Sequence, residues 1–483
     1  MSEVNEEERN IDIDSEEDKR KTDKKIIHVM IAVSALFLSL ISFLLYINLF
    51  KTEEYAQNPY NPRQWSEERH IKRGDIFDKN GVVLATSEFE DEGVQRRIYP
   101  EGNLYSHIIG YSSRVYGKSN LEMEYNSELL GKNDFAISFD NVKQGSSLNL
   151  TIDNRIQKYA REQMKGRKGA VVAINPSTGE IIAMVSLPDY DPSSEALEEE
   201  WKNLAESEDY ALLPRATQGL YAPGSTFKIL TSAAAYENNL EDTVLEDTGG
   251  FEKDGIKVAN YNDKVYGEMD LKQSFEVSSN QMFCELAYNM GGDTILEMAE
   301  RFGINKEIKF DLKTEKSRIE YDKMYNMDAA MVGIGQGKLL VTPLQMAMIG
   351  SAVANDGIMM KPYLVDSVER ANGTVISETQ IKSLGKVLDY DTAAFLKELM
   401  VVSVEAGTSV RASIRGIQVA GKTGTAENET NKTHSWFVGF APAERAEICV
   451  AVILEYDGTT GGSTAAPIGG NVMKKYLETV GKN

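Results

Sequence analysis

One uninterrupted apolar segment near the N-terminus constrains this chain more than any other feature. From Ile26 to Phe50 there is no Asp, Glu, Lys or Arg, and about 20 apolar residues are enough for a helix to cross a bilayer. Basic residues crowd the N-terminal side of the segment, whereas Lys51 stands nearly alone after it: Lys19, Arg20, Lys21, Lys24 and Lys25. Because cytoplasmic flanks are rich in Lys and Arg, we expect the N-terminus in the cytoplasm and the large C-terminal part outside the membrane.

This segment is interpreted as an uncleaved anchor, since it is too long for a signal-peptide core and no small-x-small cleavage site follows it. The expected organisation is a cytoplasmic acidic and basic tail at 1–25, a transmembrane anchor at 26–50, a supporting domain at 51–150 and a second domain at 151–483. Carboxylates dominate the first eighteen residues, which predicts a disordered tail. The polar stretch from Lys51 to Gln64 predicts an extended spacer.

Charge and the scarcity of two residue types exclude several function classes. The 74 acidic and 52 basic residues give a net charge of −22, which disfavours a nucleic-acid partner. Only Cys284 and Cys449 are present, both in apolar patterns, so buried free thiols are expected, with a single bridge left open. The four histidines do not cluster, which argues against a metal site and a Ser-His-Asp hydrolase. They are His28, His70, His107 and His434, and only His434, a surface or strand-end residue by its position, is near any candidate site.

Alternating and apolar runs after the anchor predict an α+β fold with helices on a mainly antiparallel sheet. An Asn80-Gly81 turn between two short runs predicts a hairpin. Further strands are expected at 148–153, 169–174, 181–185, 416–420, 435–440 and 447–454, and mainly helices between Ser225 and the last three. The run at 447–454 is apolar throughout, so both its faces should be covered, one of them by a final helix at 468–480.

A short stretch from Tyr221 to Lys228 carries one hydroxyl and one amine with Ser-x-x-Lys spacing. If Ser225 opens a helix, this spacing places Ser225 and Lys228 on one face. A serine hydroxyl needs a neighbouring base to become a nucleophile, and a lysine serves only where its surroundings lower its pKa. Exposed N–H groups at a helix start favour the negative charge that develops. Since such a spacing also arises by chance in a chain of this length, it does not decide the function alone.

Two further motifs follow, each of which also has a simple structural explanation. Ser278-Ser279-Asn280 precedes an apolar helix, where Ser and Asn are ordinary N-caps. Lys422-Thr423-Gly424-Thr425 follows a strand expected to end at Ala420, where a lysine protects an edge and a glycine permits close approach by another molecule.

Together, in this order, the three motifs resemble the penicillin-binding protein and serine β-lactamase superfamily. Other segments resemble landmarks of the class B penicillin-binding proteins: Arg73-Gly74-Asp75-Ile76, Asn80-Gly81, Asn175-Pro176-Ser177-Thr178-Gly179-Glu180, Gly335-Gln336-Gly337, Thr342-Pro343-Leu344-Gln345 and Trp436-Phe437-Val438-Gly439-Phe440. The resemblance implies the penicillin-binding transpeptidase fold, an antiparallel five-stranded sheet flanked by helices, at 151–483. It also implies an N-terminal pedestal, or dimerisation-like domain, at 51–150 and a single transmembrane helix.

The implied activity is that of a peptidoglycan D,D-transpeptidase, which cross-links cell-wall stem peptides through a serine acyl-enzyme and is inhibited by β-lactams. Its partners would be the D-Ala-D-Ala stem peptide, an acceptor amine, β-lactam antibiotics and a membrane glycan polymerase of the shape or division families. No cofactor and no metal are implied.

The resemblance also implies a role for each motif residue. Ser225 would attack the peptide carbonyl and Lys228 would take its proton, while Lys422 keeps Lys228 neutral by charge repulsion. Ser278 would relay a proton to the leaving amine, and Asn280 would hold the substrate amide and orient Lys228. The terminal carboxylate would bind at Lys422, Thr423 and Thr425, with Gly424 allowing close approach. The N–H groups of Ser225 and Thr425 would form the oxyanion hole.

Two alternatives stay open beside a transpeptidase. A β-lactam-hydrolysing or β-lactam-sensing relative would share the Ser-Thr-Phe-Lys stretch, although Asn280 favours the transpeptidase branch. A non-catalytic activator of a membrane glycan polymerase would not need the motif residues, all of which are intact. The sequence leaves open the role in elongation, division or sporulation, the acceptor amine and the oligomeric state.

Overall fold

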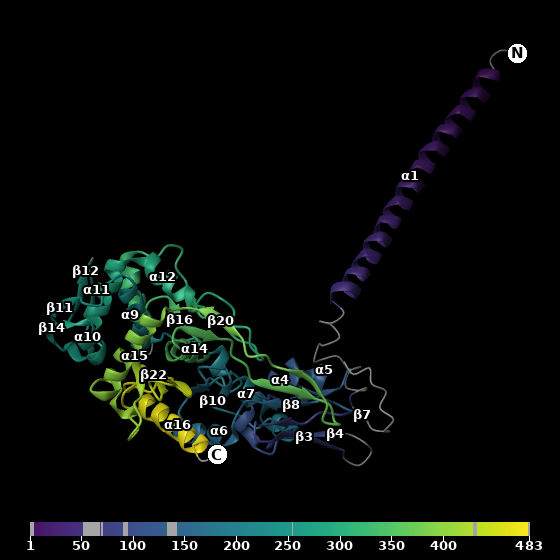
Figure 1. The fold of residues 1–483 in the computed structure, drawn as a ribbon. Coiled ribbons are helices and arrows are strands. Elements are labelled where there is room, and N and C mark those ends of the chain that lie inside the picture. Colours follow the sequence, from purple (N-terminus) through teal and green to yellow (C-terminus); the bar gives the residue numbers. More distant parts are fainter. Residues whose placement is uncertain are drawn as a thin grey trace. The chain divides into compact units, whose positions relative to one another are not determined.

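The computed structural model describes residues 4–51, 68, 71–89, 95–132, 143–253, 255–427 and 432–481, with side chains from residue 20 onward except that of residue 143. The chain divides into two compact units, Met1–Ser66 and Glu67–Asn483. In the first unit a long helix, α1 (Val4–Tyr46), continues as a short π-helix, η1 (Ile47–Lys51) (Figure 1). Its part from Arg20 to Lys51 is long and apolar enough to cross a membrane.

The prediction of a disordered tail is wrong for the residues that the structure describes, because α1 already begins at Val4. Glu, Lys and Arg are good helix formers, and a following apolar helix removes the cost of nucleating the tail separately. The predicted spacer beyond Lys51 lies outside the described residues.

A five-stranded sheet forms the centre of the second unit, with the strand order β10-β9-β23-β22-β21. All four neighbouring pairs are antiparallel, so the predicted sheet is confirmed. Its strands are β9 (Gly169–Ile174), β10 (Ile181–Leu187), β21 (Ala420–Ala426), β22 (His434–Ala441) and β23 (Ile448–Leu454). The strand β21 stands at one edge, and this places its sequence beside the residues that follow Tyr221.

Helices cover both faces of this sheet, as the apolar run of β23 predicts. Cys449, Ala451 and Ile453 lie in one buried cluster with α14 (Pro343–Ala354). Alternate residues of β23 lie in a second cluster with α6 (Asn154–Met164) and α16 (Ala465–Val480). This alternation follows from the two-residue period of a strand. Both cysteines are buried free thiols.

The remaining helices of the second unit include a group at one end, near β11, β12 and β14 in Figure 1. The helices are α7 (Ser194–Ala205), α8 (Arg215–Gln218), α9 (Lys228–Glu237), α10 (Leu271–Val277), α11 (Asn280–Met290), α12 (Gly292–Arg301), α13 (Asn326–Gly333) and α15 (Tyr390–Glu405). The expectation of mainly helices after Ser225 is wrong between α9 and α10. There, two small hairpin-like sheets pair β11 (Val244–Asp247) with β14 (Gly267–Asp270), and β12 (Gly250–Lys253) with β13 (Ile256–Ala259). Four-residue strands rich in charged side chains leave no clear alternation in the sequence.

A second sheet, of six strands in the order β19-β18-β8-β2-β3-β4, supports the pedestal region. Its strands are β2 (Ile76–Phe77), β3 (Val83–Phe89), β4 (Gln95–Ile98), β8 (Ser147–Leu150), β18 (Val365–Glu369) and β19 (Val375–Glu378). The hairpin at Asn80-Gly81 is confirmed: Gly81 has φ +79°, and the Asp78 carboxylate accepts the N–H groups of Asn80 and Val82. Two strands of this sheet, β18 and β19, come from the C-terminal part of the chain.

Short elements complete the described fold. They are η3 (Gly102–Tyr105), α4 (Asn120–Glu124), α5 (Asn126–Leu129), η4 (Gly224–Phe227), η5 (Tyr261–Asp263) and η6 (Val410–Ala412), with β1 (Ile71–Lys72), β5 (Ser112–Ser113), β6 (Gly117–Lys118), β7 (Lys143–Gln144), β15 (Arg318–Ile319), β16 (Leu339–Leu340), β17 (Ile358–Met360) and β20 (Ser383–Lys386).

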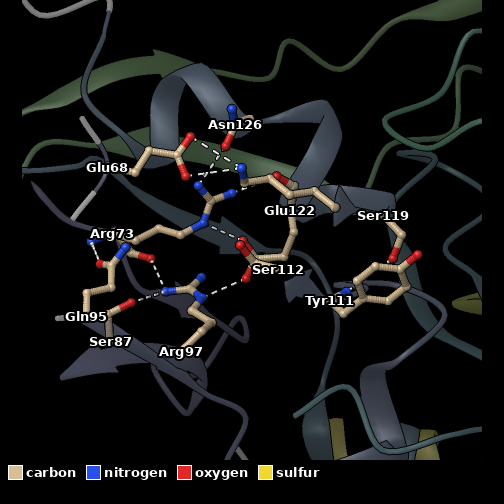
Figure 2. Close-up of polar contacts among 12 residues, drawn as sticks. Glu68, Arg73, Ser87, Gln95, Arg97, Tyr111, Ser112, Ser119, Glu122 and Asn126 are labelled. Carbon is tan, nitrogen blue, oxygen red and sulfur yellow. Dashed lines mark hydrogen bonds and ion pairs between the residues drawn. The ribbon is translucent and has the colours of Figure 1, made fainter. Parts of the chain in front are cut away.

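A buried ionic cluster holds the pedestal together, and Figure 2 shows two guanidinium groups converging on Glu122. The Nε atoms of Arg73 and Arg97 lie 2.5 and 2.6 Å from the Glu122 carboxylate. None of the three residues is more than 7% exposed. Burial raises the pKa of Glu122, but the two arginines outweigh it, so this pKa is lowered and the carboxylate stays charged.

Substituting Glu122 tests this cluster. Because Glu122→Gln leaves two buried guanidinium groups without a counter-charge, we expect the free energy of unfolding to fall by about 3–5 kcal/mol. The control is Lys272→Ala, which breaks the exposed Lys272–Glu398 pair and should change it by less than about 1 kcal/mol. Denaturant unfolding followed by tryptophan fluorescence measures both. Equal losses in the two variants would contradict the role of the cluster.

Candidate active site

The structure brings Ser225 to the edge strand of the central sheet. Ser225 lies in the one-turn 3₁₀-helix η4, and α9 begins three residues later, at Lys228. The predicted helix start is therefore correct in place, but its first turn is 3₁₀ rather than α. Ser225 is half-buried, whereas the Lys228 side chain is fully buried.

Three glycines allow the loop that carries Ser225 to sit where it does. A Cβ on Gly335 would lie 1.9 Å from the carbonyl oxygen of Gly224, and one on Gly424 would lie 2.7 Å from that of Pro223. A Cβ on Gly224 would lie 2.8 Å from the carbonyl oxygen of Thr425. Backbone therefore packs directly on backbone on both sides of the loop, which fixes the position of Ser225 relative to β21.

The Lys228 amine is held by the Ser278-Ser279-Asn280 segment. Its Nζ donates to Asn280 Oδ1 at 2.8 Å, to the Ser278 carbonyl at 2.9 Å and to the Ser279 carbonyl at 3.2 Å, and it lies 3.3 Å from Ser278 Oγ. Ser278 ends α10 in a left-handed conformation, and Ser279 caps α11 by accepting the N–H of Met282. The N-cap interpretation of this motif is therefore confirmed for Ser279, and the same segment supplies the hydrogen-bond partners of Lys228.

Lys422 contacts the same Ser278 hydroxyl as Lys228. Its Nζ donates to Ser278 Oγ at 2.9 Å, and its side chain is fully buried. The expectation that a strand ends at Ala420 is wrong: β21 begins there, so Lys422, Thr423, Gly424 and Thr425 lie inside the strand. The glycines of this segment made it look like a loop in the sequence. In the structure they lie within the edge strand and leave room for close neighbours, such as the Phe437 ring beside Gly421.

Burial lowers the pKa of both amines. The pKa of Lys228 falls to about 7 because the ammonium has lost its water. The pKa of Lys422 lies well below its usual value because of burial and, in addition, the nearby charge of Lys228. We expected Lys422 to help keep Lys228 neutral by charge repulsion, but burial is what lowers the pKa of Lys228, and the repulsion appears only in the lowered pKa of Lys422.

The motif residues Thr423 and Thr425 of β21 contact two neighbouring loops. Thr423 Oγ1 donates to Thr408 Oγ1 at 2.7 Å, and Thr425 Oγ1 lies 3.4 Å from the N–H of Gly461. Thr408 and Gly461 carry no motif and were not predicted. They bring two loops, after α15 and before α16, against the strand.

A buried network that sequence reasoning missed holds the N-terminal side of the Ser225 loop. The Tyr221 hydroxyl donates to Glu455 at 2.5 Å, and Arg215 Nε donates to the same oxygen at 2.8 Å. Trp436 Nε1 donates to the Ala222 carbonyl at 3.0 Å. The ring of His434, the first residue of β22, stacks edge-on to Tyr221, so its strand-end position is confirmed, and it is buried. These contacts join β22 and β23 to the loop.

This arrangement can perform acyl transfer. It combines a half-buried serine, an amine whose pKa lies near neutrality and a hydroxyl shared by two amines, which can pass protons between them. In the described part of the chain, no group of three or more His, Cys, Asp and Glu side chains is placed to hold a metal ion.

Comparisons with known proteins agree with this chemistry. Residues 169–474 match the penicillin-binding protein transpeptidase domain, and residues 73–147 match the penicillin-binding protein A dimerisation domain. The peptidoglycan D,D-transpeptidase PbpA of Mycolicibacterium smegmatis is 33% identical, over 91% of this chain and 96% of that protein.

Two solved structures are similar over most of the chain. One is the D,D-transpeptidase domain of a peptidoglycan glycosyltransferase from Eggerthella lenta, with 39% identity and a TM-score of 0.79 over 86% of this chain and all of that one. The other is penicillin-binding protein A from M. tuberculosis as a ceftriaxone acyl-enzyme, with 32% identity and a TM-score of 0.81 over 85% of this chain and 99% of that one.

Gly335→Ala tests the close packing of the Ser225 loop. Both Gly335 and Gly373 have a positive φ, but a Cβ on Gly373 meets nothing within 4 Å, whereas one on Gly335 meets the Gly224 carbonyl. Gly373→Ala should therefore show only the backbone strain of about 1 kcal/mol. We expect Gly335→Ala to lower the melting temperature clearly further. Similar melting temperatures for the two variants would show that the loop does not depend on this contact.

Proposed function

This chain belongs to the class B penicillin-binding proteins and is a peptidoglycan D,D-transpeptidase, and from that premise we propose which of its residues carry the reaction. The observation that carries the proposal is the Ser278 hydroxyl, which lies within hydrogen-bond range of both Lys228 and Lys422. We assign the pedestal to residues 51–150 and the transpeptidase domain to 151–483. The two domain matches, at 73–147 and 169–474, support this division.

In the first half-reaction, Ser225 Oγ attacks the carbonyl carbon between the last two D-alanines of a stem peptide. Its proton passes to a neutral Lys228, and the oxyanion accepts hydrogen bonds from the N–H groups of Ser225 and Thr425. The carbon–nitrogen bond then breaks. Ser278 hands a proton to the departing amine and is itself reprotonated by Lys228, which leaves an ester on Ser225.

The second half-reaction runs the same steps in reverse with another amine. The acceptor amine of a neighbouring stem peptide attacks the ester carbonyl and gives its proton back through Lys228 to Ser225. A new peptide bond forms, and the serine is free again. Asn280 would hold the amide of the donor peptide, and its Oδ1 accepts a hydrogen bond from Lys228, the proposed base, at 2.8 Å.

The substrate would bind along the edge strand. Its terminal carboxylate would lie beside Lys422, Thr423 and Thr425, with Gly424 leaving the strand edge open. A negative charge there raises the pKa of Lys422 and so favours an ionic contact between the two groups. Lys228 would act as the base once it has lost its own proton, which its pKa of about 7 permits near neutral pH.

The same serine would react with β-lactams. Penicillin-binding protein A of M. tuberculosis has been solved as acyl-enzymes with ceftriaxone, imipenem and penicillin G. We propose that these compounds acylate Ser225. Asn280 favours the transpeptidase branch over a β-lactamase, so we expect the acyl group to be released slowly.

We further propose that residues 26–50 anchor the protein in the cell membrane as a single span. The N-terminus would be cytoplasmic and the catalytic domain extracytoplasmic, because basic residues crowd the segment before the apolar run. A membrane glycan polymerase would then supply the strands that are cross-linked. Relatives include Peptidoglycan D,D-transpeptidase MrdA of Acinetobacter baumannii and Stage V sporulation protein D of Bacillus subtilis, each 30% identical.

Mass spectrometry of the intact protein tests the nucleophile. After incubation with benzylpenicillin, the wild type should gain one penicilloyl group, and Ser225→Ala should gain none. Ser232→Ala is the matched control, since Ser232 lies on the following α9 and is fully buried, and it should still be labelled. A full adduct on Ser225→Ala would disprove the assignment.

The pH dependence of acylation tests the base. Because protonated Lys228 cannot accept the serine proton, the rate constant should rise with pH through about 7, the pKa of Lys228. Below that midpoint it should fall roughly tenfold per pH unit. Lys228→Arg keeps the charge at every pH and should abolish acylation throughout. A profile that stays flat over about 1.5 pH units on either side of this midpoint would rule out Lys228 as the base.

A further inference from the structure

A buried carboxylate that belongs to no motif lies behind the candidate site. Asp247, the last residue of β11, is 0% exposed. It accepts hydrogen bonds from Ser279 Oγ at 2.5 Å, from Asn260 Nδ2 at 2.7 Å and from the N–H of Gly249 at 3.0 Å. All three donors are neutral. Burying a carboxylate without a directly bonded cationic partner costs free energy. The burial of Asp247 therefore suggests a role for its charge.

Two hydrogen-bonded bridges join Asp247 to the Lys228 amine. In the first, Ser279 donates its hydroxyl to Asp247 while its carbonyl accepts from Lys228 Nζ at 3.2 Å. In the second, Asn260 donates to Asp247 and accepts the N–H of Asn280 at 2.8 Å. Asn280 Oδ1 in turn accepts from Lys228. Two of the four groups around the amine, the Ser279 carbonyl and Asn280 Oδ1, are therefore held in place through residues that bond to Asp247.

Asp247 is the carboxylate that acts on Lys228, and Glu285 acts on the neighbouring Cys284. Burial raises the pKa of Cys284 to about 12, so its thiol is neutral. Burial, with a smaller contribution from Asp247, also raises the pKa of Tyr266. Lys228 and Lys422 are the basic groups, and each lies within hydrogen-bond range of the Ser278 hydroxyl. With one proton on the two amines, Asp247 makes the buried assembly electrically neutral, which offsets the cost of burying that ammonium.

We propose that Asp247 is a positioning residue that acts on Lys228 by its charge and through Ser279 and Asn260, and so sets the pH range in which Lys228 works as a base. This inference rests on the function proposed above. The direction follows from electrostatics: burial lowers the pKa of Lys228, whereas Cys284 and then Asp247 raise it. A carboxylate does so because it stabilises the protonated amine. Without Asp247, the amine should lose its proton at lower pH.

The test is the pH profile of Ser225 acylation by benzylpenicillin, measured with the full-length protein. In Asp247→Asn we expect the midpoint to move to lower pH by about half a unit or more. Asp78→Asn is the matched control, because Asp78 is also a buried carboxylate bonded to neutral donors, the N–H groups of Asn80, Val82 and Asn154. Its midpoint should equal that of the wild type.

A second variant separates charge from packing. Ser279→Ala removes one bridge and the cap of α11 but keeps the charge of Asp247, so it should lower the maximal rate without moving the midpoint. An equal shift in Ser279→Ala and Asp247→Asn would overturn the charge explanation. If Asp247→Asn does not fold, Asp247→Ser takes its place and should show the same shift.

The outcomes for the two proposals are distinct. A wild-type protein whose acylation does not depend on pH contradicts the proposed role of Lys228. A wild-type profile with a midpoint near 7, together with the same midpoint in the folded Asp247 variant, leaves the role of Lys228 intact and overturns the inference on Asp247.

Discussion

Two fully buried amines that meet on one serine hydroxyl are the constraint on which the rest of this site depends. Water would keep both Lys228 and Lys422 protonated, and only its removal brings the pKa of Lys228 to about 7. That removal needs the three elements that supply Lys228, Ser278 and Lys422 to close on one another. The fold therefore serves the chemistry chiefly by excluding solvent from these amines.

The surrounding contacts hold these elements in position relative to one another. Glycines at 224, 335 and 424 let backbone touch backbone around Ser225. The Arg215–Glu455–Tyr221 network fixes the preceding residues. Farther away, the ionic cluster around Glu122 stiffens the pedestal, and β18 and β19 join that pedestal sheet to the C-terminal part of the chain. Each of these buried polar or backbone contacts permits few alternative arrangements of the residues that form it.

The sequence predicted what local pattern determines and missed what only tertiary contacts determine. The uninterrupted apolar run of β23 predicted a sheet covered on both faces. The three motifs predicted five catalytic side chains, of which Lys228, Ser278, Asn280 and Lys422 lie in one hydrogen-bonded group. The start of β21 was misplaced, because its glycines are explained only by neighbours distant in sequence. Asp247, Asn260 and Glu455 carry no recognisable spacing, since their importance comes from burial beside partners that are far along the chain.

The most direct test of this account is the titration of Lys228 itself. In a protein labelled with ¹³C at the lysine Cε atoms, NMR can follow that signal with pH, and its absence from Lys228→Arg assigns it. The account predicts a midpoint near 7. A midpoint near 10.5, the usual value for a lysine, would contradict it, because Lys228 would then hold its proton throughout the physiological range.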